Sequence, residues 1–169
     1  MKYIISTLLT LAIAVGIASP VQAKRGSDGQ LNLLYWQAPS TMNPNLSGGT
    51  KELEASSVVL EPLGRYDENG NLLAWLAEEI PTVANGGISK DLTTITWKIK
   101  KGIKWSDGSA LTADDAVFTY EYCSNPDTGC TQSNYWSDIK SVTAVNSLTV
   151  KVEFTVPKPF PYAPFVGYN

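Results

Sequence analysis

The sequence predicts a mixed α/β domain, and three stretches carry that prediction. Residues 94–100 and 148–154 alternate between apolar and polar side chains, which is the pattern of strands with one buried and one solvated face. Residues 112–124 begin with a helix start signal and continue with apolar positions at helical spacing. Because apolar faces must cover one another, these stretches indicate a layered domain in which a helix packs on a sheet.

The helix expected at residues 112–124 has a well-defined start. Thr112 is the expected N-cap, and Asp115 stands three residues later, where the acid of a capping box lies. Asp114 and Asp115 also fall in the first turn, where the helix dipole favours negative charge. The Asp107-Gly108 pair just upstream has the composition of a turn. This stretch therefore predicts a structural joint between a strand and a helix.

Two hairpins complete the expected strands. Residues 140–145 and 148–154 flank the Asn146-Ser147 pair, which predicts a hairpin with a two-residue turn. Residues 64–72 contain Asn69-Gly70, the strongest short-range hairpin signal because both residues tolerate positive φ.

The N-terminal part of the chain is less regular. Residues 31–36 form a short apolar run that predicts a buried strand, and the proline-containing segment 37–44 predicts a loop at its carboxyl end. A helix capped by Thr50 is expected next. For residues 72–80, a short helix and an irregular strand both stay open.

Composition excludes several functional classes. The 169 residues are 43% hydrophobic and 10% aromatic, which supports a packed core and argues against disorder. The net charge is −3, so the chain lacks the basic footprint of a nucleic-acid binder. The sequence contains no histidine, which removes the commonest general base and metal ligand. No cofactor and no metal site are expected.

Residues 1–23 are expected to be a secretory signal peptide. Lys2 supplies a positive start, residues 4–17 are apolar, and Val21-Gln22-Ala23 is a small-x-small cleavage site. The apolar run is short for a membrane span, and no cysteine near the cleavage site supports a lipid anchor. A periplasmic protein that does not span the membrane after cleavage is predicted, beginning near Lys24.

Export places the two cysteines in an oxidising compartment. Cys123 and Cys130 enclose Ser-Asn-Pro-Asp-Thr-Gly, a run of turn formers that can bring the two sulfur atoms together. A local disulfide is the favoured interpretation, with two unpaired thiols as the alternative.

Three carboxylates invite an enzymatic interpretation. Asp107, Asp114 and Asp115 could act as paired acids in acid/base or glycosidase chemistry. Their positions favour structural roles, because the first is a turn residue and the other two lie in the first turn of a helix. No catalytic residue is therefore predicted.

Collinear motifs across residues 30–169 resemble the extracellular solute-binding proteins of ABC importers, specifically the dipeptide- and oligopeptide-binding family. The chain carries these motifs in the family's order: Leu60-Glu-Pro-Leu-Gly-Arg-Tyr-Asp67, Leu76-Ala-Glu-Glu-Ile-Pro81, Trp97-Lys-Ile-Lys-Lys-Gly-Ile-Lys-Trp-Ser-Asp-Gly108, Thr112-Ala-Asp-Asp-Ala-Val-Phe118 and Thr149-Val-Lys-Val-Glu-Phe154. The resemblance implies a two-lobed periplasmic binding protein fold, of which this chain would be the N-terminal part.

The resemblance also implies a domain division. Residues 24–49 would supply the first strand and loop of lobe I, and residues 50–169 its smaller, β-rich subdomain. The second lobe would be missing from a truncated chain. The acidic residue that pairs with a peptide's N-terminus in the family would lie in that missing part.

Candidate ligand contacts lie in two regions. The resemblance places backbone contacts in the loop after the first strand, at Gln37, Ala38, Pro39 and Ser40, although Pro39 has no N–H to donate. Trp36, at the carboxyl end of that strand, is a further candidate, with a role as a core residue as the alternative. The aromatic pair Tyr135 and Trp136 is a candidate pocket wall.

The predicted function is the substrate-binding component of an importer. It would capture peptides through backbone hydrogen bonds, close two lobes around them and deliver them to membrane permease subunits. The protein is expected to be a monomer and not an enzyme. The alternatives are another solute on the same fold (an oligosaccharide, an opine or a nickel complex) and a secreted hydrolase.

Overall fold

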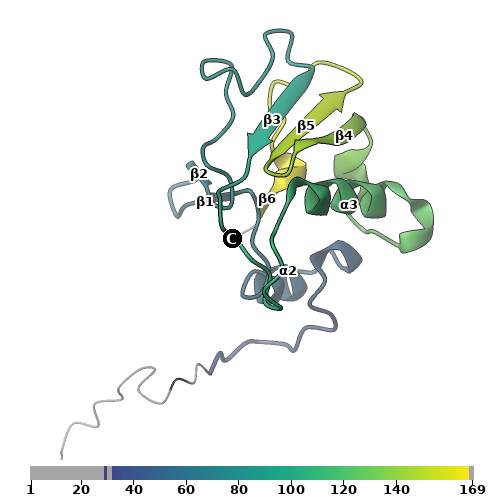
Figure 1. Ribbon diagram of the computed structural model, residues 1–169. Helices are drawn as coiled ribbons and strands as arrows, with labels where there is room; N and C mark the ends of the chain where they lie inside the picture. The colour runs from purple at the N-terminus through teal and green to yellow at the C-terminus, as the bar shows by residue number, and fades with distance from the viewer. Residues whose placement is uncertain (1–28, 30–31, 168–169) are drawn as a thin grey trace, which may run out of the picture. The chain divides into compact units, whose positions relative to one another are not determined.

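The computed structural model describes residue 29 and residues 32–167 (Figure 1). The signal peptide expected at residues 1–23 lies outside this part. The chain divides into two units, Met1–Trp36 and Gln37–Asn169, and each is treated on its own. In the first unit, residues 32–36 have no regular secondary structure. The strand expected at 31–36 is therefore not formed by its described residues, because no described strand pairs with their backbone groups.

The larger sheet of the second unit contains β3 (Thr94–Lys98), β4 (Ile139–Asn146) and β5 (Thr149–Phe154). Its order is β3-β5-β4, with both pairs antiparallel. Ile95 lies opposite Val152 in this register, and both side chains are fully buried. The alternation of the sequence and the hairpin expected at 140–154 are thus confirmed.

Helix α3 (Ala113–Ser124) packs on β4 and β5 (Figure 1). Thr112 is its N-cap, and Asp115 Oδ2 accepts a hydrogen bond of 2.7 Å from the Thr112 N–H. The expected helix and its capping acid are confirmed. The sheet covers only part of the helix, however, because Phe118 is 66% exposed and packs against Tyr122 with ring centroids 6.2 Å apart.

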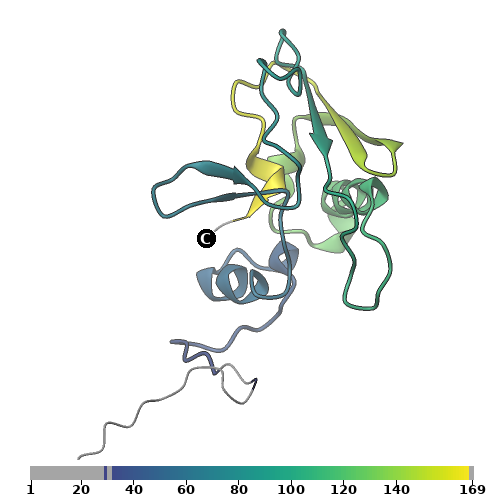
Figure 2. The ribbon, with the colours of Figure 1, turned by 60° about the vertical axis from the view of Figure 1, so that its left-hand side comes forward.

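A smaller sheet contains β1 (Gly64–Tyr66), β2 (Leu72–Ala74) and β6 (Val166–Gly167) in the order β2-β1-β6. Strands β1 and β2 form the expected hairpin, which projects from the larger sheet (Figure 2). In its turn, the Asp67 carboxylate accepts hydrogen bonds from the Asn69 and Asn71 N–H groups. Strand β6 joins β1 in parallel, so residues about a hundred positions apart share one sheet.

Residues 72–80 resolve as an irregular strand. Strand β2 ends at Ala74, and Ala77 then forms an isolated antiparallel bridge with Ile99. The remaining helices are short: η1 (Pro44–Leu46), α2 (Thr50–Ser56), η2 (Pro126–Thr128), η3 (Ser133–Trp136) and η4 (Ala163–Phe165).

The prediction that Thr50 is the N-cap of α2 is wrong by one residue. Gly49 is the N-cap, and Thr50 is the first helical residue. The buried residues of this helix are Glu52 and Ser56, although both are polar. The reason is that Glu52 forms polar contacts with the preceding loop, as described below.

The core of the second unit surrounds Trp97, which is fully buried on β3. Its ring lies 5.8 Å from that of Phe165 and 6.2 Å from that of Tyr162. Phe165 in turn meets Trp136, edge to face, at 5.6 Å. Tyr162 and Phe165, near the C-terminus, therefore help to complete the core, whereas Phe160 just before them is 60% exposed.

Replacement of Asp115 by alanine should weaken the fold by breaking the helix cap. We expect Asp115→Ala to lower the free energy of unfolding by about 1 kcal/mol, since loss of a cap costs roughly 0.5–2 kcal/mol. Asp114→Ala is the matched control, because this exposed neighbour shares the first turn. In salt that screens the helix dipole, the control should cost less than about 0.5 kcal/mol. Equal losses in urea titrations would refute the capping role.

Candidate functional site

The loop at residues 37–40 is anchored on the first turn of α2. The Ser40 N–H and hydroxyl both donate to Glu52 Oε1, at 2.9 and 2.6 Å. Lys51 Nζ donates to the Ala38 carbonyl oxygen at 3.1 Å. The candidate ligand loop is therefore tied to a helix by its own backbone groups.

The anchoring carboxylate is buried and ionised. Glu52 is 1% exposed and pairs with Lys51 Nζ at 2.9 Å. The hydroxyl of Ser40, then its N–H, then Lys51 lower the pKa of Glu52 to about 2, because hydrogen bonds and a nearby cation favour the charged form. A Cβ at Gly49 would lie 2.5 Å from Glu52 Oε2, so the glycine N-cap leaves the room that the carboxylate occupies.

The anchor occupies one edge of the loop backbone. The Ala38 carbonyl and the Ser40 N–H both face α2, which is the alternation that an extended segment gives. The intervening Pro39 has no N–H, so its carbonyl is the only backbone hydrogen-bonding group that it can offer. A ligand paired with this loop would thus find an acceptor at Pro39, while the donor at Ser40 is already used.

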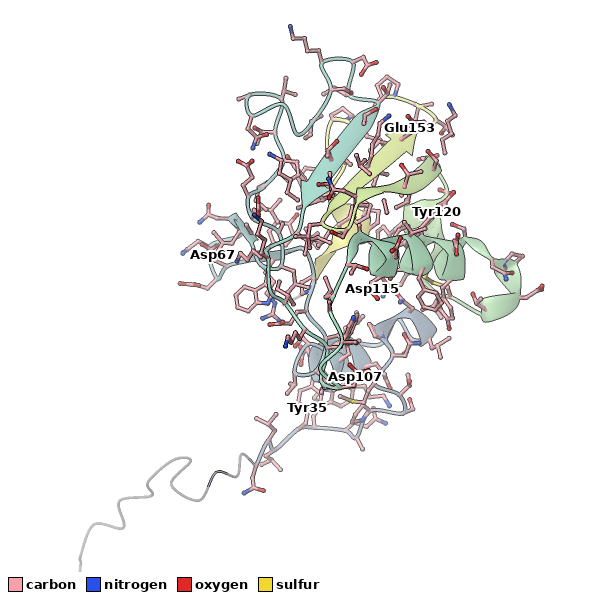
Figure 3. The ribbon with its side chains drawn as sticks, in the orientation of Figure 1. Tyr35, Asp67, Asp107, Asp115, Tyr120 and Glu153 are labelled. Atoms are coloured by element: carbon pink, nitrogen blue, oxygen red, sulfur yellow. A yellow bond between two sulfur atoms is a disulfide. The ribbon has the colours of Figure 1, made fainter. Side chains whose placement is uncertain are left out.

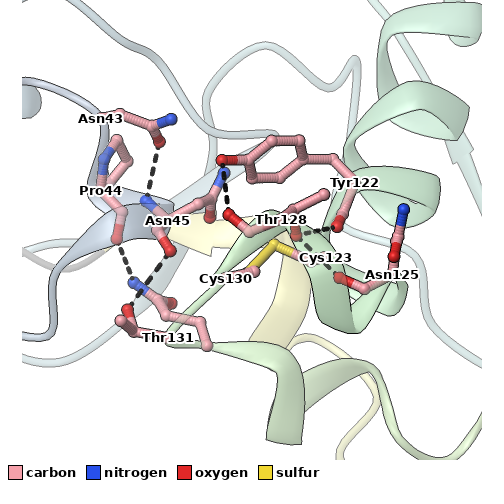
Figure 4. The surroundings of a disulfide bond; sticks show 10 residues. Asn43, Pro44, Asn45, Tyr122, Cys123, Asn125, Thr128, Cys130 and Thr131 are labelled. Carbon is pink, nitrogen blue, oxygen red and sulfur yellow. Dashed lines mark hydrogen bonds between the residues drawn. A yellow bond between two sulfur atoms is a disulfide. The ribbon is translucent and has the colours of Figure 1, made fainter.

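Helix η1, which follows the loop at residues 37–40, is held by the segment around the disulfide (Figure 4). Cys123 and Cys130 are bonded as expected, with 5.1 Å between their Cα atoms. Directly after Cys130, the Thr131 N–H donates to the Asn45 carbonyl at 2.8 Å, and Gln132 Nε2 donates to the Pro44 carbonyl at 2.9 Å. The residues that directly follow the disulfide therefore bind η1 through two hydrogen bonds.

The aromatic candidates separate in the structure. Tyr135 and Trp136 lie on η3, where Trp136 is buried against Phe165 and Tyr120 and Tyr135 is 39% exposed. Trp36 belongs to the first unit, where its ring is 5.9 Å from that of Tyr35.

A groove of about 480 Å³ lies in the second unit between α2, α3 and the smaller sheet. Its walls are mostly apolar, and Trp136 is part of them, whereas Tyr135 and residues 37–40 are not. Apolar residues that line it include Leu53, Leu60, Leu111, Phe118, Trp136 and Phe165. Phe118, which is 66% exposed, therefore lies on the wall of this groove.

Two of the acids considered for catalysis, Asp107 and Asp115, lie on different elements (Figure 3). Asp107 accepts hydrogen bonds from the Ser109 hydroxyl at 2.7 Å and N–H at 2.8 Å, and these lower the pKa of Asp107. Asp115 caps α3 from a different element. Among residues 32–167, no group of three or more potential metal-binding side chains occurs. Turn and cap formation account for Asp107 and Asp115.

Sequence reasoning did not find Lys51, Glu52, Thr131 or Gln132. The one available signal was the spacing of Glu52, three residues after Gly49, which is the acid position of a capping box. The N–H of Gly49, which the acid of such a box would accept from, donates to Ser47 Oγ at 3.2 Å, and the Glu52 carboxylate accepts from Ser40 instead.

Residues 71–168 match the family described as "Bacterial extracellular solute-binding proteins, family 5 Middle". The chain belongs to this family. No helix in the described part of this family member is long and apolar enough to cross a membrane.

Two relatives extend the match beyond the family segment. A "Probable ABC transporter-binding protein" of Deinococcus radiodurans is 32% identical over 168 residues, covering 91% of this chain and 27% of that protein. "Oligopeptide-binding protein OppA" of Bacillus subtilis is 28% identical over 162 residues, covering 86% and 29%. The chain thus spans less than a third of the length of these relatives.

Solved structures share the fold. Haemophilus influenzae OppA in complex with the peptide RPPGFSPFR has a TM-score of 0.67 and 25% identity, covering 75% of this chain and 27% of that chain. NikZ from Campylobacter jejuni in complex with Ni(L-His) has a TM-score of 0.63 and 28% identity, covering 76% and 24%. These structures confirm a mixed α/β segment of a two-lobed binding protein.

Removal of the disulfide should loosen η1. In the double variant Cys123→Ser/Cys130→Ser, the loop before Thr131 gains conformational freedom, and the free energy of unfolding should fall by roughly 2–3 kcal/mol in the chain-entropy account of a short closed loop. Amide hydrogen exchange at residues 43–46 should increase more than exchange within β5. Unchanged exchange at η1 would show that the disulfide loop does not hold it.

Acid should weaken the contribution of Glu52 to stability. Since the pKa of Glu52 lies at about 2 in the fold and at 4.5 in its ordinary state, its stabilisation is complete above pH 4.5. It is lost as the pH falls through about 2. The groups that face the carboxylate are Ser40 and Lys51. The stability difference between wild type and Glu52→Gln in urea titrations should therefore shrink from pH 5 to pH 2; a constant difference would contradict the low pKa.

Proposed function

We propose that the complete protein is the substrate-binding component of an ABC importer and that it captures peptides. The observation that carries this proposal is the family match over residues 71–168, together with the likeness to OppA of Haemophilus influenzae, a peptide complex. Extended peptides are recognised through backbone hydrogen bonds along strand edges, while wet pockets accept their varied side chains.

The loop at residues 37–40 supports a backbone-directed contact. Its α2-facing edge is fixed by Lys51 and Glu52, and Pro39 offers a carbonyl on the other edge. In this proposal Trp36, Gln37, Ala38, Pro39 and Ser40 contact the peptide from one lobe.

An aromatic wall would complete this side of the site. Tyr135, which is partly exposed on η3, would form its surface, and the buried Trp136 would support it through its contact with Phe165. Rigid aromatic side chains supply contact area at a low entropic cost.

The chain would occupy a defined place in a two-lobed protein. Residues 24–49 would provide the first strand and loop of lobe I, with the strand pairing in the complete protein with a partner strand from the rest of that lobe, and residues 50–169 would provide its smaller subdomain. Ligand capture would close the lobes by hinge bending, because ligand binds the closed state more tightly than the open one. The closed protein would dock on permease subunits as a monomer.

Export would follow from a cleaved signal peptide at residues 1–23. The positive start and the apolar run support this assignment. The mature protein would then act in the periplasm without a lipid anchor, in agreement with a family described as extracellular.

A nickel complex is the second candidate ligand. The likeness to NikZ, whose structure holds Ni(L-His), favours it specifically. In such a complex a small molecule supplies metal ligands, so the absence of histidine from this chain does not conflict with it.

Calorimetry of the complete protein separates these candidates. Titration with a mixed peptide pool should give saturable binding, because peptide backbones present the donors and acceptors that the loop edge needs. Titrations with an oligosaccharide pool and with Ni(L-His) are the comparisons. Binding of either one in the absence of any peptide signal would overturn the peptide assignment.

A further inference from the structure

One polar contact in the second unit joins a helix to the candidate ligand loop through a buried charge. Ser40 donates twice to Glu52, and Lys51 links the same carboxylate to the Ala38 carbonyl. A buried carboxylate is costly unless it is hydrogen-bonded and paired. Among the described residues, the donors to this carboxylate from outside α2 are the N–H and hydroxyl of Ser40, and the carboxylate loses both of them when the loop leaves this position.

We propose that Glu52 is a positioning residue for ligand binding: it fixes residues 38–40 on α2 so that their opposite edge stays presented to the ligand. This inference rests on the proposed function. It goes beyond that function by assigning binding affinity to a side chain that does not itself face the ligand edge.

The geometry explains why this side chain suits the task. The first turn of α2 supplies both Lys51 and Glu52. These side chains bind Ala38 and Ser40, which are two residues apart in the loop. Holding alternate residues along one edge fixes the orientation of the backbone between them, at Pro39. Gly49 leaves the space in which the carboxylate lies, so the anchor depends on small as well as charged residues.

Fixing a loop before binding raises affinity without any new ligand contact. A loop that must be ordered on binding costs free energy for each residue and side chain immobilised. With the anchor intact, that cost is met during folding. Without it, the ligand must order residues 38–40, and affinity falls. A loss of about tenfold or more in Kd is the expected size, since about 1.4 kcal/mol of ordering corresponds to a factor of ten.

The test compares variants of the complete protein. Glu52→Ala removes the acceptor, and we expect Kd for a peptide pool to rise about tenfold or more. Glu52→Gln keeps an oxygen that can accept from Ser40 and should restore most of the affinity. Glu54→Gln changes another acid of the same helix and should leave Kd unchanged. Amide hydrogen exchange at Ser40 should rise in Glu52→Ala and not in Glu54→Gln.

A stability-matched control separates positioning from general weakening. Ile95→Val removes a methyl group from the core of the larger sheet and lowers Tm without touching the loop. If Ile95→Val and Glu52→Ala lower Tm equally and lose equal affinity, the positioning role is wrong. An unchanged Kd in Glu52→Ala, or faster Ser40 exchange with no loss of affinity, would also overturn it.

Failure of this inference is distinguishable from failure of the peptide assignment. If the wild type binds Ni(L-His) or a sugar and no peptide, the proposed function fails. The same variants are then measured with that solute. A weaker affinity of Glu52→Ala for it supports the positioning role, and an unchanged affinity refutes it.

Discussion

The burial of Trp97 on β3 is the contact on which the rest of the second unit depends. Its ring meets Phe165, and Phe165 meets Trp136. Each aromatic pair of this kind contributes about 0.5–1.5 kcal/mol beyond the area that it buries. Through these contacts the sheet positions η3 and η4, which lie far from β3 in the sequence, and it thereby holds the segment that leads back to the disulfide.

That segment connects the core to the candidate ligand loop. Thr131 and Gln132 precede η3 and donate to the carbonyl groups of η1, while Ser40 is bonded to Glu52 of α2. The loop between residues 37 and 46 is thus held at both ends by polar contacts that the apolar core supports from behind. A loop whose ends are fixed in this way keeps one backbone conformation, which is what a site built on main-chain groups needs.

The sequence predicted those parts of the fold that depend on local pattern. Strand β3, the β4–β5 hairpin and the capped start of α3 follow from alternation, turn composition and the spacing of Thr112 and Asp115, all of which act within a few residues. The strand expected at 31–36 was not formed among its described residues, because a strand also requires a partner, and hydrophobicity says nothing of where that partner lies. Strand β6 was missed for the same reason, since it exists only through pairing with β1.

In the candidate site too, local signals in the sequence were predictive and long-range contacts were not. The loop at 37–40 was proposed through family resemblance, and the disulfide followed from two nearby cysteines, a short-range signal. The Glu52–Ser40 contact spans twelve residues and joins a helix to a loop, so no local pattern specifies it. In the structure it is recognised by a charged side chain at a buried position of a short helix. The low pKa of Glu52 indicates that this carboxylate binds the loop backbone as an anion. It does not suit proton transfer, because at neutral pH it neither gives nor takes a proton. The charge therefore belongs to the architecture of the domain, in which α2 holds one edge of the loop at residues 38–40.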